Sequence, residues 1–140
     1  MTGKYLVDLT DDRFKTAQND DVIAFIRAKN PSSHSDVGEL LISFSKQVAG
    51  SHFYCPSYKS CAYVALHTGG DRIFAISYGQ HAMAFKLTPG AVNDARADGG
   101  VADEEIGPDW VRFEPWHRGT VPPERLLHWT QVAFEAAANA

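Results

Sequence analysis

Long apolar runs are missing from this 140-residue sequence, and its first residues do not predict a secretory leader. A membrane-spanning helix needs roughly 18 or more consecutive apolar residues, and no run here approaches that length. Residues 1–5 contain one lysine but neither an apolar segment nor a small-residue cleavage motif. We therefore expect a cytoplasmic protein with no membrane partner.

Cysteine is also scarce. The sequence has two, Cys55 and Cys61, six positions apart. Disulfides are rare in cytosolic proteins because the cell keeps thiols reduced, so we expect both cysteines to be free. The spacing alone leaves a bridged or a metal-bound state open.

Basic residues do not gather anywhere in the chain. Thirteen lysines and arginines stand against seventeen aspartates and glutamates, a formal net charge of -4. Nucleic-acid-binding proteins usually present a basic stripe that neutralises phosphates, and no such stripe is visible. Residues 94–109 hold six acidic side chains against one arginine, a local charge of -5 that leaves about +1 for the rest. The charge therefore argues against a nucleic-acid partner without settling the question.

What the sequence does contain is an ordinary globular composition, 44% hydrophobic and 21% charged. A chain of this length has room for one domain, so we expect a single domain over residues 1–140, with residues 1–11 as an extended arm. From about Asp12 the apolar residues recur at helical spacing until residues 30–31, Asn-Pro, end the pattern. A second apolar stripe over residues 37–48 predicts a helix with Asp36 as its N-cap.

The centre of the sequence changes to the pattern of β-strands. Residues 62–67, 72–78 and 81–87 are rich in β-branched and aromatic residues, and short gaps that contain glycine separate them. Such gaps are typical of tight hairpin turns, so we predict a meander of three antiparallel strands. Simple alternation would place Phe74 and Ile76 on the same face of the middle strand.

The last third of the sequence returns to helices around one more strand. Thr88 and Pro89 predict the N-cap and first residue of a short helix, and the acidic segment after it is expected to be an exposed loop. Residues 110–114 alternate like a strand. A final helix is expected to bury Leu126, Trp129, Thr130, Ala133, Phe134 and Ala137. The predicted fold class is α+β, with helices packed on one antiparallel sheet made of the meander and this later strand.

Four short motifs accompany this order of elements: Gly70-Asp71-Arg72-Ile73-Phe74-Ala75, Ala84-Phe85-Lys86-Leu87-Thr88-Pro89, Trp110-Val111, and Trp129 with Ala133, Glu135 and Ala136. They resemble the glycine-led strand, the lysine-containing strand, the W-V strand and the closing helix of the TfoX N-terminal and YjbR (MmcQ)-like family, over residues 37–138. The resemblance implies a compact domain with helices packed on one antiparallel sheet. It also implies a role in DNA binding or competence regulation, which the acidic charge opposes.

One cluster, His52, Cys55, Cys61 and His67, has the residue types of a zinc site. Strong zinc signatures contain two close ligand pairs, and this spacing has only one. If residues 62–67 form a strand, Cys61 and His67 lie about 20 Å apart at ~3.3 Å per residue, too far for one ion. We therefore assign no metal. Cys55 near His52 is the better candidate for a catalytic thiol, but the sequence shows no base that reaches it, so we assign no catalytic residue.

Several aromatic and polar side chains fit a small-molecule cleft, because binding pockets combine aromatic walls with a few polar groups. A place in the sheet core fits the tyrosines equally well. No glycine-rich loop has the context of a phosphate site, so we predict no cofactor. The candidate ligand-binding residues are His52, Tyr54, Cys55, Tyr58, His81 and Trp116.

Three classes of function stay open. A non-catalytic binding or interaction domain for a small molecule or another protein is favoured, because no catalytic constellation is visible. A DNA-associated regulatory protein follows from the family resemblance but not from the charge. A zinc-binding or cysteine-dependent enzyme would need the cluster around Cys55. An exposed sheet edge would also allow two chains to pair as a homodimer.

Overall fold

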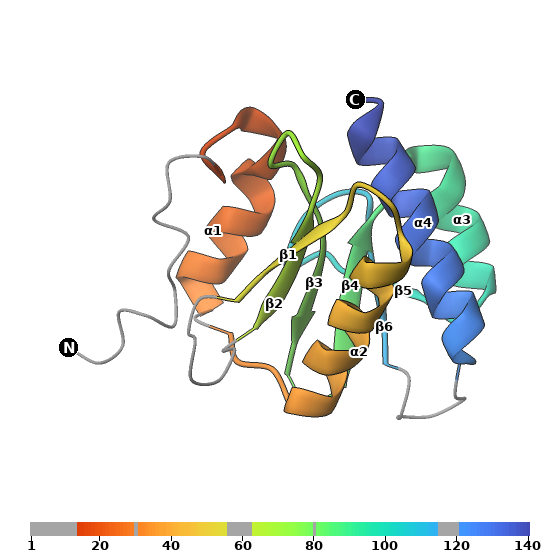
Figure 1. The fold of residues 1–140 in the computed structure, drawn as a ribbon. Helices are drawn as coiled ribbons and strands as arrows, with labels where there is room; N and C mark the ends of the chain where they lie inside the picture. Colours follow the sequence, from red (N-terminus) through yellow and green to blue (C-terminus); the bar gives the residue numbers. More distant parts are fainter. Residues whose placement is uncertain (1–13, 30, 56–62, 80, 115–120) are drawn as a thin grey trace.

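The computed structural model describes residues 14–29, 31–55, 63–79, 81–114 and 121–140. In this part of the chain, six antiparallel strands form one sheet in the order β1-β2-β3-β4-β6-β5 (Figure 1). The strands are β1 (His52–Tyr54), β2 (Val64–His67), β3 (Ile73–Tyr78), β4 (Ala82–Lys86), β5 (Val101–Ala102) and β6 (Trp110–Phe113). The helices are a short 3-10 turn (Ala17–Asn19), α1 (Asp20–Lys29), α2 (Ser35–Gln47), α3 (Pro89–Ala97) and α4 (Pro123–Ala138). The predicted α+β class is confirmed, and the predicted extended arm lies outside the described residues.

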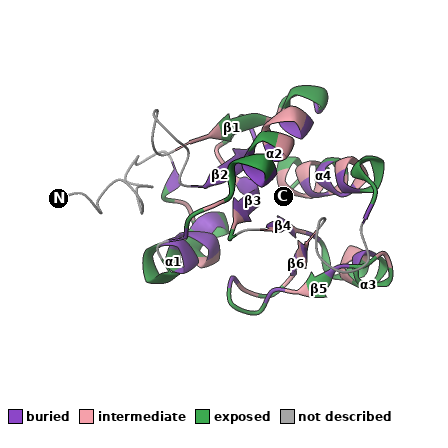
Figure 2. Cartoon of the chain, turned by 90° about the horizontal axis from the view of Figure 1, so that it is seen from below, coloured by how far each residue is buried: buried purple, intermediate pink, exposed green. Residues whose placement is uncertain are grey.

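The helices lie on both faces of the sheet. α2, α3 and α4 cover one face and α1 covers the other (Figures 1 and 2). The first core, between the sheet and the three helices, includes Leu41, Phe74, Phe85, Phe113, Leu126 and Trp129. The second core, on the α1 side, includes Phe14, Val22, Ile26, Ile76, Ala84 and Trp110. The central strands are therefore buried on both faces, which is why they read as nearly continuous apolar runs.

A β-bulge interrupts the alternation of β3. Leu66 of β2 pairs with Ala75, but the next residue, His67, pairs with Ile73, so Phe74 is an extra residue in the ladder. Phe74 and Ala75 both pack in the first core, whereas Ile73 packs in the second core. The prediction that Phe74 and Ile76 share a face is therefore wrong, because the inserted residue reverses the alternation between them.

The N-terminal helix begins later than its apolar pattern predicts. α1 starts at Asp20, because the buried side chain of Asn19 holds the preceding residues in another path. Its Nδ2 donates to the carbonyl oxygens of Phe14 and Asp71, each at 2.9 Å. Its Oδ1 accepts from the backbone N–H of Ile73 at 2.8 Å. Asn19 thus joins the segment before α1 to the start of β3.

The helix caps give one confirmed prediction and one correction. Thr88 is the N-cap of α3, and its hydroxyl accepts from the backbone N–H of Ala91. The N-cap of α2 is His34 rather than Asp36, because the His34 Nδ1 accepts from the Asp36 N–H at 3.1 Å. Asp36 lies in the first turn instead, where a negative charge still favours the positive end of the helix dipole.

The acidic segment is more than an exposed loop. The segment contains β5, which pairs with β6. Asp103, directly after β5, is only 1% exposed. Gly100 permits this close pairing, since an ideal Cβ there would lie 2.4 Å from Cγ1 of Val111. The expectation of an exposed loop is therefore wrong for Asp103, while the two glutamates that follow it are exposed.

Candidate ligand-binding site

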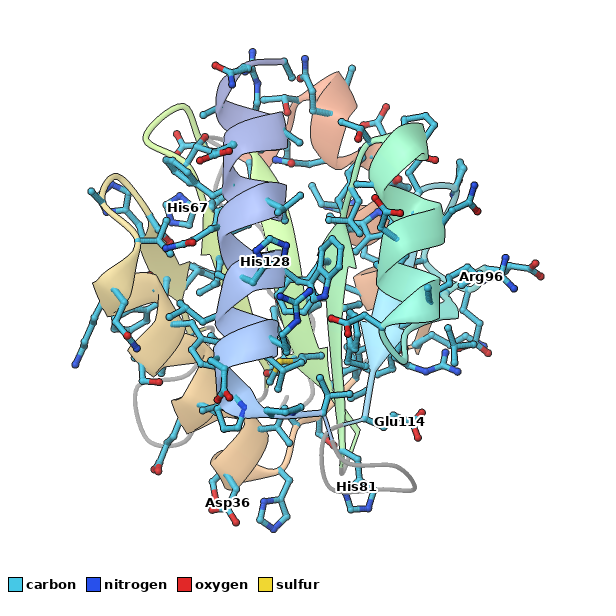
Figure 3. All side chains as sticks on the ribbon, turned by 90° about the vertical axis from the view of Figure 1, so that its right-hand side faces the viewer. Asp36, His67, His81, Arg96, Glu114 and His128 are labelled. Atoms are coloured by element: carbon cyan, nitrogen blue, oxygen red, sulfur yellow. The ribbon has the colours of Figure 1, made fainter. Side chains whose placement is uncertain are left out.

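A pocket of about 290 Å³ opens at the end of the sheet where β3 turns into β4. Strand pairing assembles it: Tyr78 at the end of β3 pairs with Ala82, and Arg112 of β6 pairs with Ala84 of β4. Gly79 makes the turn with a φ of 66°, a conformation that glycine adopts without strain. Figure 3 shows His81 and Glu114 together at this end of the molecule. The lining residues are Tyr78, Gly79, His81, Ala82, Glu105, Arg112 and Glu114.

A polar network holds two of these side chains in place. The Tyr78 hydroxyl donates a hydrogen bond to Oδ2 of Asp103. The Arg112 Nη1 lies 3.7 Å from the same oxygen, and the Arg112 Nε donates to Oε2 of Glu114 at 3.0 Å. The guanidinium is therefore fixed between two carboxylates at the pocket wall, in the charge-assisted geometry that orients arginine most strongly.

Asp103 is the buried centre of this network. Its side chain is fully shielded from solvent, and its Oδ1 has no hydrogen-bond partner among the described residues. Its backbone is fixed as well, because its N–H donates to the Trp110 carbonyl at 2.8 Å. A buried carboxylate is costly unless it is paired, so Asp103 depends on Arg112 and Tyr78. We call Tyr78, Asp103, Arg112 and Glu114 the Tyr78 network.

The network keeps the Tyr78 hydroxyl protonated. Burial, the hydrogen bond to Asp103 and the negative charge of Asp103 raise the pKa of Tyr78 well above its ordinary value of 10.0. The nearby Arg112 opposes this shift without cancelling it. Tyr78 therefore acts as a hydrogen-bond donor near neutral pH and is unsuited to accept a proton.

The structure does not bring the predicted ligand-binding residues together. His81 lines the pocket, whereas His52, Tyr54 and Cys55 lie on or just after β1, at the edge of the sheet. His52 pairs with His67 at the far end of β2, and Figure 3 shows His67 and His81 at opposite ends of the molecule. The last two candidates, Tyr58 and Trp116, lie outside the described residues.

The histidines near β1 form a packed pair. The rings of His52 and His67 stack with their centroids 5.5 Å apart, and the His67 Nδ1 lies 2.9 Å from the carbonyl oxygen of Thr68. Across the ranges that the structure describes, no three His, Cys, Asp or Glu side chains are grouped as metal ligands would be. His67 is buried, and its ring also packs edge-on against Phe14 of the second core.

Cys55 is disulfide-bonded. The expectation of a free thiol at this position is therefore wrong. Cys61, the only other cysteine of the sequence, lies outside the described residues. Tyr54 of β1 pairs with Ala65 of β2, so the two ends of the segment that joins these strands lie close together.

Sequence reasoning missed most of the Tyr78 network. The strand pattern is equally consistent with a place for Tyr78 in the sheet core, and Asp103 belongs to an acidic segment that is predicted to be exposed. A weak signal exists for Arg112, because it is the one charged residue within the apolar β6 segment. Its partners come from β3 and from the segment after β5, and only the strand order shows that these are neighbours.

In comparisons with family models, with curated proteins and with solved structures, nothing matches this chain. Of the helices that the structure describes, none has the length and apolar character needed to cross a membrane.

Proposed function

We propose that this chain is a non-catalytic binding domain of the TfoX/YjbR-like type, and that it takes a small polar ligand in the pocket of the Tyr78 network. One observation carries the proposal: the buried Asp103 holds the Tyr78 hydroxyl and the Arg112 guanidinium at the wall of that pocket. Polar groups that are already fixed on paired strands lose little conformational entropy when a ligand binds, which favours binding.

The chemistry of the pocket supports binding over catalysis. Tyr78 is held protonated and donates its only O–H to Asp103, so its oxygen can accept a hydrogen bond from a ligand but cannot act as a base. The sulfur of Cys55 is in a disulfide, and a nucleophile or a zinc ligand would need it as a thiolate. The volume of about 290 Å³ lies at the lower end of the range for small-molecule sites, so the ligand is expected to be a small metabolite.

Native mass spectrometry of protein purified from a bacterial cytoplasm tests the proposal. The wild-type chain should carry an additional small-molecule mass. Tyr78→Phe, which removes only the hydroxyl, and Glu114→Gln, which removes one guanidinium partner, should both carry less of it. Arg96→Gln is the matched control, because Arg96 is exposed on α3 and points away from the pocket (Figure 3).

The outcomes separate clearly. Loss of the mass in the two pocket variants, with retention in Arg96→Gln, supports the site. A bare wild-type chain, or a bound mass that all three variants retain equally, would overturn the proposal. Two-dimensional NMR of the loaded protein adds a location, since the amides of Gly79, Ala82 and Arg112 should shift when the ligand is removed.

A further inference from the structure

The edge strand β1 is poorly covered. It pairs with β2 on one side, and no other strand of the described ranges pairs with its outer side (Figure 2). All of β2 is buried, whereas His52 is exposed and Phe53 is 43% exposed. An exposed edge presents unpaired backbone N–H and C=O groups, and proteins usually cover or blunt such an edge. β1 is therefore a place where one more strand can add to the sheet.

The two faces of this edge differ. Phe53 pairs with Leu66, a residue of the first core, so Phe53 lies on the face of the sheet that α2 covers. Tyr54 packs against the second core instead. Among the described residues, Phe53 and Val101 are the only large apolar residues that are exposed. A strand that covers this edge should therefore bring apolar side chains to the side of Phe53.

The described part of the chain begins beside this edge. Phe14 is fully buried, and its ring centroid lies 5.1 Å from those of Tyr54 and His67. Its carbonyl oxygen accepts from the Asn19 amide, which also binds the backbone at the start of β3. The start of β3 pairs with His67, and His67 pairs with His52, the first residue of β1. A strand that leads along β1 to this point would therefore run antiparallel to β1.

Residues 5–9, Tyr-Leu-Val-Asp-Leu, have the alternation of such a strand. The three odd-numbered residues are all apolar, and they share one face in an extended chain. Residues 10–13, Thr-Asp-Asp-Arg, are polar and connect this segment to Phe14. The six residues from Asp8 to Phe14 span up to about 20 Å when extended. This length exceeds the roughly 10 Å of two strand spacings, so the connection can cross from the outer side of β1 to Phe14.

We infer that residues 5–9 form a further strand, which pairs antiparallel with the outer side of β1 and has Val7 opposite Phe53. In this register Tyr5 and Leu9 lie on the same face as Val7, and the three side chains shield Phe53 from solvent. The occupant of the β1 edge is thus the N-terminal segment of the same chain, and it closes this edge to other chains.

The same register suits the other face of β1. It places Asp8 opposite His52, so a carboxylate lies beside an exposed imidazole that becomes positively charged when it is protonated. It also places Leu6 opposite Tyr54. Side chains that lie directly opposite each other contribute to the stability of a sheet when they are apolar and aromatic or of opposite charge. Both faces of the segment therefore have complementary neighbours on β1.

Nuclear Overhauser spectroscopy of the isotope-labelled full chain tests this inference. Backbone protons of Val7 should show cross-strand contacts with those of Phe53, and backbone protons of Asp8 with those of His52. A mixture of labelled and unlabelled chains, recorded with an isotope filter, should show none of these contacts between molecules. Absence of the contacts in the folded chain, or their appearance only between molecules, would overturn the inference.

Hydrogen exchange of a variant gives an independent test. Val7→Asp places a charge against Phe53, so the β1 amides that do not bond to β2 should exchange at least about tenfold faster than in the wild type. Thr2→Asp is the matched control, because it adds the same charge outside the paired segment and should leave this exchange unchanged. The amides of β3 should keep their protection in both variants, which shows that the sheet stays folded. Equal exchange of β1 in the wild type and Val7→Asp, or equal acceleration by Thr2→Asp, would contradict the pairing.

Discussion

At the scale of the residue, buried polar side chains decide how the parts of this chain meet. Asn19 satisfies three backbone groups at once and so joins the N-terminal segment to the sheet. Asp103 likewise joins β3, β5 and β6 through Tyr78 and Arg112. Removing one partner of such a group costs more than an average hydrogen bond, because the other partner stays buried and unpaired. These positions should tolerate substitution poorly although their side chains are polar.

The titration of Tyr78 is the first testable consequence. Its raised pKa favours the neutral phenol in the folded state. The stabilisation is therefore fully present below the ordinary tyrosine pKa of 10.0 and is lost as the pH rises through the higher folded pKa. We expect the difference in phenolate absorbance between the wild type and Tyr78→Phe to have its midpoint well above pH 10.0, provided the protein stays folded.

Asp103→Asn separates the causes of that shift. Burial is the largest cause and persists in this variant, whereas the negative charge is removed, so the pKa of Tyr78 should fall only part of the way toward its ordinary value. A difference midpoint near 10.0 in the wild type would show that the hydroxyl is solvated and that the network does not form.

Residue types alone could not have predicted this site. His81 was a reasonable candidate because it follows a turn between two predicted strands. Tyr78 is distant in sequence from Asp103 and Arg112, and it meets them only because β6 inserts beside β4 and β5 pairs with the outer side of β6. That placement depends on contacts such as Gly100 against Val111, which no local pattern records.

At the scale of the element, local patterns predicted the existence of most helices and strands but missed where α1 and α2 start. β6 follows its predicted alternation, and α3 and α4 follow their apolar periodicity because each helix packs its apolar residues on the sheet. β1 and β5 are two or three residues long and carry no pattern that could distinguish them from loops. The bulge at Phe74 likewise arises from pairing with β2 and not from the sequence of β3 alone.

The contact between α3 and α4 gives a prediction for acid stability. The Asp98 Oδ2, just after α3, accepts from the Trp129 indole N–H at 2.8 Å and from the Arg125 Nε at 3.0 Å on α4. The hydrogen bond from Trp129 and then the Arg125 contact hold the pKa of Asp98 below its ordinary value of 3.8. The stabilisation is therefore present above pH 3.8 and is lost as the pH falls through the lower folded pKa.

Urea unfolding of the wild type and Asp98→Asn over a pH series measures this effect. The wild type should be more stable near neutral pH, and the two unfolding free energies should converge in acid, where Asp98 is itself neutral. Asp94→Asn, on the exposed side of the same helix, is the control and should run parallel to the wild type. A constant gap between the wild type and Asp98→Asn at every pH would mean that the charge of Asp98 contributes nothing.

At the scale of the whole molecule, one sheet supplies a wall to both cores. β2, β3 and β4 each place side chains in the first core and in the second core. The two faces of a strand share one backbone, so loss of packing in one core should also destabilise the other core. The pocket of the Tyr78 network, at one end of the sheet, then rests on a rigid support, which suits a site that must keep polar groups in fixed positions.

Hydrogen exchange can test whether the two cores unfold together. Leu41 is fully buried in the first core, and Leu41→Ala should lower the free energy of unfolding by about 2–5 kcal/mol through the cavity it leaves. If the sheet couples the cores, the amides of Ile26, in the second core, should lose as much protection as those of Phe44 beside Leu41. The volume-conserving Leu41→Met should cost less than about 1.5 kcal/mol and change both sets little. Faster exchange confined to α2, with Ile26 unchanged, would show that α1 and its face of the sheet fold as a separate unit.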